Sequence, residues 1–548
     1  MIQNLKLVFH TVKYLKFTQI FNRLKRRYIT QSINISPAPS VSLIHRKPES
    51  FIVGEIRMLG ENRFKFLNIT ANINELQDWN QACQEKLWLY NLHYFDDLNA
   101  INADQRINWH SNLIDRWIYE NPPGQGNGWE AYPSSLRIIN WIKWALIGNS
   151  FKQVWLDSLA IQVRYLSSNL ETHLLGNHLF ANAKALIFAG LFFKGHEADD
   201  WYQTGLHIIE KEISEQVLND GGNFELSPMY HSIFLSDLLD LVNIHNVFNT
   251  KQISGVEVKI PMMFNWLKSM CHPDGGVSFF NDTAFGIAPT LDDLLDYAGR
   301  LRIKNIEKKF KTLEYLNDSG YIRVEKENIV AMIDVANIGP KYIPGHGHAD
   351  ALSFELSLFG KRVIVNSGIS VYGKSSERHK QRSTLSHSTV VIDDQNSSEV
   401  WDGFRVARRA NVLKIKTQLN KKSTKVSASH DGYQRLKGRP IHKREWNFVD
   451  NELIITDSVN GKGVHNIKSI WPLHPEVSII NSKDDSIKLK VDGKLVQILF
   501  EGSGKLKLVS SQYHPEFGLS VDNKQLVYVY IGSLPSVVIT KVIWQNHY

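Results

Sequence analysis

The sequence predicts a multidomain α+β protein with a helical N-terminal domain followed by a large antiparallel β-sandwich. At 548 residues the chain exceeds what one hydrophobic core usually supports. Apolar residues recur at helical spacing between about residues 75 and 310, and from about residue 315 they alternate as in strands. These changes predict the domain boundaries 1–75, 76–314 and 315–548.

The first segment, 1–75, begins with the basic stretch MIQNLKLVFHTVKYLKFTQIFNRLKRRYIT. Lys6, His10 and Lys13 interrupt its apolar residues, so it has no clear signal-peptide core or cleavage site and leaves the localisation open. It predicts an amphipathic basic helix. Two interpretations stay open: peripheral contact with a membrane surface, or packing on its own domain. Residues 35–75 predict a connecting or capping segment with short strands.

Helical spacing is clearest in 134–148, 178–193, 201–218 and 232–248. Loops rich in Gly, Asn and Pro separate these segments, so successive helical hairpins are expected to stack in an arc or toroid. The longest apolar run, ALIFAGLFF, is too short to cross a bilayer, and no transmembrane segment is predicted.

The C-terminal part carries β-branched, alternating runs bounded by turn residues: YIRVEKENIVAMIDVA, ALSFELSLFGKRVIVNSG, HSTVVIDD, STKVSASHDGY, WNFVDNELIITDSV and SIKLKVDGKLVQILF. No helical pattern interrupts them convincingly, which predicts an antiparallel β-sandwich. Ligand sites commonly lie in clefts between domains, so we expect the site between the two halves.

The net charge of +8 favours a polyanionic partner: nucleic acid, anionic lipid or acidic polysaccharide. No nucleic-acid-binding signature supports the first. The two cysteines exclude a disulfide framework and a cysteine metal site.

Four polar clusters stand out. In ENPPGQGNGWEAYPSSLRI, Trp129 and Tyr132 are candidates to stack on a sugar ring, or they belong to an ordinary helix-start loop. In LLGNHLFANAKAL, Asn177 and His178 precede a helix, where an amide either caps the helix or donates to a bound carboxylate.

The third cluster, NDGGNFELSPMYHSIF, places Glu225, Tyr230 and His231 in one loop and helix start. Tyrosine, with a pKa of about 10, is a weak acid at neutral pH. Beside cationic or metal neighbours it serves as an acid or a base. The alternative is a tyrosine whose hydroxyl is simply satisfied in a cleft wall.

The fourth cluster is GHGHAD, followed by LSHSTVVID. On a strand, His346 and His348 would face the same side and suit a transition metal, or divide proton transfer and metal binding between them. His387, at a strand entrance, and Asp350 could complete such a site.

The stretches KLWLYNLHYFDDL, NPPGQGNGWEAYPSSLRIINW, GNHLFANAKAL, DGGNFELSPMYH, GHGHADALSFEL and LSHSTVVID occur in this order over roughly residues 85–395. In these motifs the chain resembles the heparinase II/III-like family of polysaccharide lyases, most closely members encoded with bacterial surface-polysaccharide genes. The resemblance implies an incomplete (α/α) toroid followed by an antiparallel β-sandwich, in agreement with the periodicity. It also implies β-elimination on an acidic polysaccharide that contains uronic acid.

Position by position, the resemblance assigns Asn177, with His178, to neutralising the uronate carboxylate. Tyr230 matches the catalytic tyrosine, an acid and for some uronate epimers also the base, and His346 matches the alternative base. The expected substrate contacts are Trp129, Tyr132, Glu225 and His231.

The resemblance also implies that His348 and His387 are metal ligands. Relatives that bind zinc place Asp where this chain has Asn366, and an amide is a poorer zinc ligand. The reaction needs no cofactor, so two alternatives stay open: a structural zinc completed by Asp350 or Asp393, or a metal-free hydrogen-bonded cluster. The oligomeric state is not predicted.

Three other functions fit part of the pattern. A uronate C5-epimerase would use the same proton abstraction, and a catalytically silent glycan-binding protein would keep only the groove. A glycoside hydrolase needs two carboxylates flanking the bond, and only Glu225 lies in a motif. The lyase hypothesis requires Tyr230, from the helical half, and His346, from the sheet half, to converge on one groove.

Overall fold

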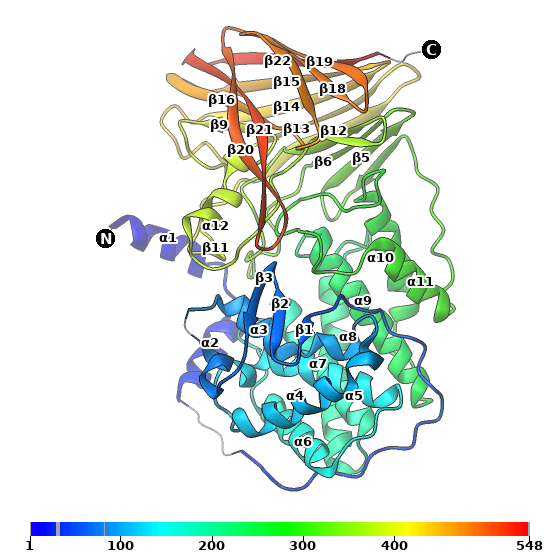
Figure 1. Ribbon diagram of the computed structural model, residues 1–548. Coiled ribbons are helices and arrows are strands. Elements are labelled where there is room, and N and C mark those ends of the chain that lie inside the picture. Colours follow the sequence, from blue (N-terminus) through cyan, green and yellow to red (C-terminus); the bar gives the residue numbers. More distant parts are fainter. Residues whose placement is uncertain (1, 29–32, 82, 546–548) are drawn as a thin grey trace.

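The computed structural model describes residues 2–28, 33–81 and 83–545. A helical domain and an antiparallel β domain lie one above the other in Figure 1, joined by the chain that follows the last helix of the helical domain. The predicted fold class is therefore confirmed.

Two N-terminal helices precede the helical domain, α1 (Ile2–Val12) and α2 (Phe17–Tyr28). The connecting segment forms the small sheet β1 (Met58–Gly60), β2 (Arg63–Phe66) and β3 (Ile69–Asn72), as its composition predicts. No helix among the described residues is long and apolar enough to cross a membrane.

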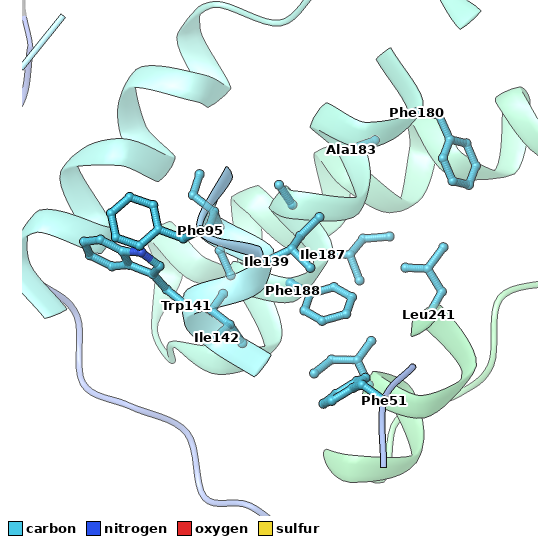
Figure 2. Packing of buried hydrophobic residues seen from close by; sticks show 14 of the residues in the cluster. Phe51, Phe95, Ile139, Trp141, Ile142, Phe180, Ala183, Ile187, Phe188 and Leu241 are labelled. Carbon is cyan, nitrogen blue, oxygen red and sulfur yellow. The ribbon is translucent and has the colours of Figure 1, made fainter. Parts of the chain in front are cut away.

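The helical domain consists of α3 (Lys86–Tyr94), α4 (Ile107–Glu120), α5 (Ala131–Leu146), α6 (Gln153–Ser168), α7 (Gly176–Phe192), α8 (His196–Gln216), α9 (Pro228–Val247), α10 (Val256–Ser269) and α11 (Leu291–Arg300). Helix α7 is apolar on nearly every side and packs against α5, α8 and α9. Figure 2 shows Ile187 and Phe188 of α7 gathered with Ile139 of α5 and Leu241 of α9. A helix that is hydrophobic all round belongs in a core, and α7 is the centre of this domain.

The β domain contains three main sheets. Their strand orders are β4-β5-β6-β7-β8, β12-β13-β14-β15-β22-β19-β18-β17 and β20-β21-β16-β9. The bounds are β4 (Leu313–Leu316), β5 (Tyr321–Lys326), β6 (Ile329–Asp334), β7 (Phe354–Leu358), β8 (Lys361–Ile364), β9 (Val390–Ile392), β12 (Val412–Leu419), β13 (Thr424–His430), β14 (Ile441–Val449), β15 (Glu452–Asn460), β16 (Val464–Pro472), β17 (Ser478–Ser482), β18 (Ser486–Val491), β19 (Lys494–Glu501), β20 (Lys505–Glu516), β21 (Leu519–Ser533) and β22 (Ser536–Trp544). Residues of all three sheets share one apolar core, including Phe354, Trp446 and Trp471.

Two features of this domain differ from the sequence prediction. A short helix, α12 (Ser376–Gln381), and the two-residue strands β10 (Val400–Trp401) and β11 (Arg405–Val406) interrupt the sheets. The segment 335–353 between β6 and β7 is a loop, so His346 and His348 do not lie on a strand. Pro344 and the glycines beside both histidines favour a turn over an extended ladder.

The two domains share an apolar interface. Trp266 and Met270 at the end of α10 pack with Tyr321 and Met332 of the first main sheet. Arg323 of β5 donates hydrogen bonds to the carbonyl oxygens of Ser269 and Cys271. This contact fixes the helical and sheet residues that face each other across the groove described next.

Candidate active site

A groove of about 830 Å³ opens where the helical domain meets loops of the β domain. Its walls include side chains of α5, α7 and α9 on one side and residues 346, 372–375 and 404 on the other. Among the residues predicted for the site, the groove is lined by Tyr132, Asn177, His178, Tyr230 and His346.

Tyr230 stands in the first turn of α9. Ser227 caps this helix by accepting a hydrogen bond from the Tyr230 N–H, and Pro228 occupies the first helical position. The Tyr230 ring lies against the His346 ring with 3.9 Å between centroids, and its hydroxyl is 2.9 Å from that of Tyr372. Burial raises the pKa of Tyr230 well above its ordinary value, and Tyr372 adds to this. The phenol is therefore protonated, and so it carries the proton that a general acid must have.

His346 is oriented by Asp282. The imidazole Nδ1 lies 2.8 Å from Asp282 Oδ2, and the Ser227 hydroxyl donates a hydrogen bond to the Asp282 carbonyl oxygen. The carboxylate thus holds the tautomer in which Nδ1 carries the proton and Nε2 keeps its lone pair. A lone pair at Nε2, beside the Tyr230 phenol, is what a general base requires.

Asp282 is fully buried and contacts three cationic or imidazole groups. It forms a two-pronged ion pair with Arg378, and its Oδ1 lies 2.8 Å from His348 Nε2. Burial alone would raise the pKa of Asp282, but Arg378 and the two imidazoles hold that pKa well below its ordinary value. Asp282 is therefore ionised and fixes both histidines of the GHGHAD motif.

Asn177 and His178 begin α7 at the groove wall. Leu175 and Gly176 before them have positive φ angles, and a Cβ on Gly176 would lie 3.0 Å from Glu225 Oε1. Glycine is therefore needed for both the turn and the close approach. His178 Nδ1 is 3.1 Å from a Glu171 carboxylate oxygen. Burial would lower the pKa of His178, but Glu171 outweighs it and the pKa is raised.

Glu225 lies behind the groove wall, not on it. Its side chain is buried, and His346 Nε2 is 3.7 Å from its Oε2. Burial raises the pKa of Glu225, whereas His346 and the Asn177 N–H act in the opposite direction. The Glu225 carboxyl group therefore lies behind the side chains that line the groove and is not part of that lining.

Two predicted substrate contacts are wrong. Trp129 is buried against Trp117, and its indole N–H donates to the Asn121 carbonyl oxygen. His231 stacks on Trp266, and its two ring nitrogens bond the backbone of Asn223 and Met263. Both rings pack in the core of the helical domain, because the helix starts that carry them turn these side chains inward.

His348, His387 and Asn366 are brought together as predicted, in a buried chain of hydrogen bonds. His348 Nδ1 is 3.2 Å from His387 Nε2, and His387 Nδ1 is 3.0 Å from Asn366 Oδ1. Burial lowers the pKa of His348 to about 4 and that of His387 well below its ordinary value, so both rings are neutral. With His348 donating to Asp282, its Nδ1 must accept from His387. The chain is then complete if the amide nitrogen of Asn366 faces His387 Nδ1, an orientation assigned from the bonding pattern.

The donors at this cluster do not fit a structural zinc site, which takes four protein ligands of Cys, His or carboxylate type. In the described ranges, no three His, Cys, Asp or Glu side chains are grouped to hold a metal. Asp393 pairs with His465 at 2.7 Å, and Asp350 lines a separate small cavity with Asp334. Neither replaces the missing carboxylate.

The groove floor carries an ionic network that the motifs did not indicate. Lys143 and Lys184 each lie 2.6 Å from Asp240 Oδ2, and Lys184 also lies 2.6 Å from Asp237. Burial lowers the pKa of Lys143, although Asp240 opposes it. Lys143 lies on α5, Lys184 on α7, and Asp237 and Asp240 on successive turns of α9. The sequence spacing within one helix could not show that these three helices meet.

Asp282, Arg378 and Tyr372 were also missed. They come from three loops or short elements, separated by about a hundred residues at most, and none belongs to a recurring spacing. The only available signal was the polar run NDT after the apolar SFF at 278–280, which marks a loop but no chemistry.

Comparisons with known proteins agree with this architecture. The model for the heparinase II/III N-terminus matches residues 117–293, and the model for the heparinase II/III-like C-terminal domain matches residues 309–539. A heparin-sulfate lyase of Bacteroides stercoris is 28% identical over 337 residues, which cover 57% of this chain and 47% of that protein. One of Pedobacter heparinus is 26% identical over 359 residues, covering 61% and 51%.

The chain thus matches about half the length of these curated relatives. A crystal structure of heparinase III superimposes with a TM-score of 0.71 and 18% identity, covering 86% of this chain and 79% of that one. This likeness shows a shared fold. Since consecutive family models account for both domains, the chain belongs to the heparinase II/III-like family.

Proposed function

We propose that this protein is a polysaccharide lyase that cleaves a uronic-acid-containing glycan by β-elimination. The observation that carries the proposal is the contact between Tyr230 and His346 inside a groove of about 830 Å³. The similarity to heparin-sulfate lyases supports it.

In the proposed reaction, Asn177 and the His178 imidazolium bind the uronate carboxylate, which lets charge spread onto it as the C5 proton leaves. His346 Nε2 takes that proton, and Asp282 stabilises the imidazolium that forms. Tyr230 donates its proton to the departing O4 as the C4–O4 bond breaks. The products are an unsaturated uronyl end and a free hydroxyl, so atoms and charge balance.

The geometry favours elimination over C5 epimerisation. The Tyr230 and His346 rings lie against each other at an angle of 31°, so both would meet a bound sugar from one side. Epimerisation needs a second group to return a proton to the opposite face of C5. Elimination needs only one side when the C5 proton and the O4 bond are both turned toward it.

The charge of the groove points to a glycan with few sulfates. The lysines and arginines on its lining are Arg57, Lys86, Lys143, Lys184 and Lys374, and each lies within 3.1 Å of a carboxylate oxygen. Lys143 and Lys184 are largely buried with their carboxylate partners, so a sulfate would have to displace those partners to bind them. We propose that the substrate is recognised through its uronate carboxylate and hydroxyl groups.

We also propose that the His348–His387–Asn366 cluster is a metal-free support for His346. Asp282 connects this cluster to His346, since one carboxylate oxygen contacts His346 and the other contacts His348. The neutral amide completes a chain of donors and acceptors that a carboxylate at position 366 would interrupt.

The proposal is tested by incubating the protein with a panel of uronate-containing glycans in deuterated water. A lyase produces chains with an unsaturated uronyl end, seen by ultraviolet absorbance and mass. Deuterium at C5 without cleavage would identify an epimerase, and binding without either change would identify a glycan-binding protein.

A further inference from the structure

The two N-terminal helices carry apolar side chains on the face that points away from the protein. These residues, which we call the N-terminal apolar surface, follow the same spacing of 0, 3, 4 and 7 in each helix and are all exposed: Leu5, Val8, Phe9 and Val12 of α1, and Phe17, Ile20, Phe21 and Leu24 of α2. Phe9 is 67% exposed and Phe17 is 79% exposed. Eight large apolar residues in two consecutive helices are more than the scattered exposure normal for a soluble surface.

The opposite faces of these helices hold them on the protein through polar contacts. In α1, Thr11 accepts a hydrogen bond from the Trp401 indole. In α2, Gln19 is buried, and its amide donates to the carbonyl oxygens of Leu174 and Tyr342. Between the helices, Lys16 pairs with Glu215 and lies over the Tyr342 ring. The apolar residues are therefore not the ones that dock the helices, which is the reverse of an ordinary amphipathic packing helix.

All charged side chains in this N-terminal segment are cationic. Residues 1–48 contain no Asp or Glu, and Lys6, Lys13, Arg23 and Lys25 are exposed between the apolar side chains. Figure 1 shows α1 at the edge of the molecule, beside the level where the two domains meet. Nothing in the described parts of the chain covers this surface.

We propose that the N-terminal apolar surface docks the protein on an anionic lipid bilayer. An anionic bilayer accounts for both the exposed apolar side chains and the cations between them. The apolar side chains would enter the boundary of the acyl chains, and the cations would meet the headgroups. A second copy of the chain would place like-charged cations against each other. An acidic polysaccharide would use the cations but leave the apolar side chains in water. This inference is independent of the proposed lyase activity.

The test is sedimentation of the full chain with vesicles of phosphatidylcholine alone or with phosphatidylglycerol added. We expect binding to the anionic vesicles that weakens as salt rises. The double variant Phe9→Ser/Phe21→Ser should lower this affinity at least about tenfold, since each ring contributes on the order of that factor when it leaves water. The triple variant Lys6→Gln/Arg23→Gln/Lys25→Gln should lose the preference for anionic lipid by about tenfold or more.

The matched control is Val464→Ser/Ile531→Ser, which removes two exposed apolar side chains from adjacent strands of the β domain. It should bind vesicles like the unaltered protein, and all variants should keep the same turnover of soluble glycan. Failure to bind anionic vesicles at low salt would overturn the proposal. So would equal vesicle binding by the phenylalanine variant, which would indicate simple polyanion attraction, or concentration-dependent dimerisation that this variant abolishes.

Discussion

At the scale of single residues, the site depends on a carboxylate that never faces the groove. Asp282 contacts His346 through one oxygen and His348 through the other, while Arg378 neutralises it from behind. A buried ion pair of this kind contributes little net stability but becomes costly when one partner is removed. In the proposed mechanism the contribution of Asp282 is orientation, because His346 acts as the base through Nε2 and not Nδ1.

Replacing Asp282 with asparagine should lower kcat at least about a hundredfold, because the imidazole loses its tautomer and the stabilisation of its charged form. The free energy of unfolding should fall by about 3 kcal/mol, since Arg378 is left buried without a countercharge. Steady-state kinetics and chemical unfolding measure the two effects. The double variant Asp282→Asn/Arg378→Met should recover part of the stability but none of the turnover. Unchanged kcat in Asp282→Asn would show that the carboxylate does not orient the base.

Position 366 decides the metal chemistry of the neighbouring cluster. In Asn366→Asp, the carboxylate would accept a hydrogen bond from His387 Nδ1–H. The lone pair of His387 Nε2 would then face His348 Nδ1, 3.2 Å away. Two facing lone pairs and a carboxylate are suitable zinc ligands. We expect the unaltered protein to be purified without stoichiometric zinc and the variant to gain it, as measured by elemental analysis. Stoichiometric zinc in the unaltered protein would contradict the metal-free cluster.

The sequence could predict the residues that lie in compact motifs, namely Asn177, Tyr230, His346, His348 and His387. It could not predict Asp282 or Arg378, because their role arises from loops that meet only in the folded chain. It also misassigned Trp129 and His231. A motif shows which residues occur together, but not which side chains turn into the core.

At the scale of elements, the long β6–β7 loop contains one of two buried carboxyl groups that lie close together. Asp350 of this loop and Asp334 at the end of β6 line the same cavity of about 10 Å³, and both side chains are buried. Burial raises the pKa of Asp350 to about 6, and burial together with Asp350 raises the pKa of Asp334. The pair therefore keeps a proton in the folded protein that it loses on unfolding.

This arrangement makes the stability of the protein dependent on pH. Because the folded pKa of Asp350 is raised, its stabilising effect is complete below the ordinary pKa of 3.8 and is lost as the pH rises through about 6. Asp350→Asn should raise the unfolding free energy at pH 7 by on the order of 2 kcal/mol and flatten its dependence between pH 4 and 6. Thermal unfolding measured across this pH range tests both expectations. The control is Asp104→Asn, which changes an exposed carboxylate in the same way. An equal pH dependence in both variants would refute the assignment.

The helices were the elements most open to prediction. The expected segments 134–148, 178–193, 201–218 and 232–248 fall on α5, α7, α8 and α9, whose starts lie slightly earlier. The first turns were missed because their polar and proline residues, such as Tyr132, Pro133 and Pro228, break the apolar spacing while still being helical. In the β6–β7 loop, the two-residue spacing of the histidines imitates the strand period, so the sequence favours a strand where the structure has a loop.

At the scale of the whole molecule, the cationic surplus behind the net charge of +8 is not concentrated in the groove. The lysines and arginines of the groove are paired with carboxylates. Part of the cationic surplus lies in the N-terminal segment, which has no acidic residue before Glu49. Overall charge is therefore a poor guide to the charge of the groove.

This distribution predicts specificity. Turnover of an unsulfated uronate glycan should exceed that of its highly sulfated counterpart by at least about tenfold in kcat/KM, because sulfates would meet carboxylates and already paired cations. Competition between matched glycans of equal length measures the ratio. A preference for the sulfated chain would show that the groove cations release their partners on binding.

The central claim is that Tyr230 and His346 act on one sugar as a single proton-transfer unit. The most direct measurement is the rate of unsaturated uronyl formation by the unaltered protein, Tyr230→Phe, His346→Gln and the double variant, on the best substrate of the panel. We predict that each single variant loses at least about a hundredfold in kcat with unchanged thermal stability, and that the double variant is little worse than the slower single variant. Full activity in either single variant, or losses that simply multiply in the double variant, would contradict the account.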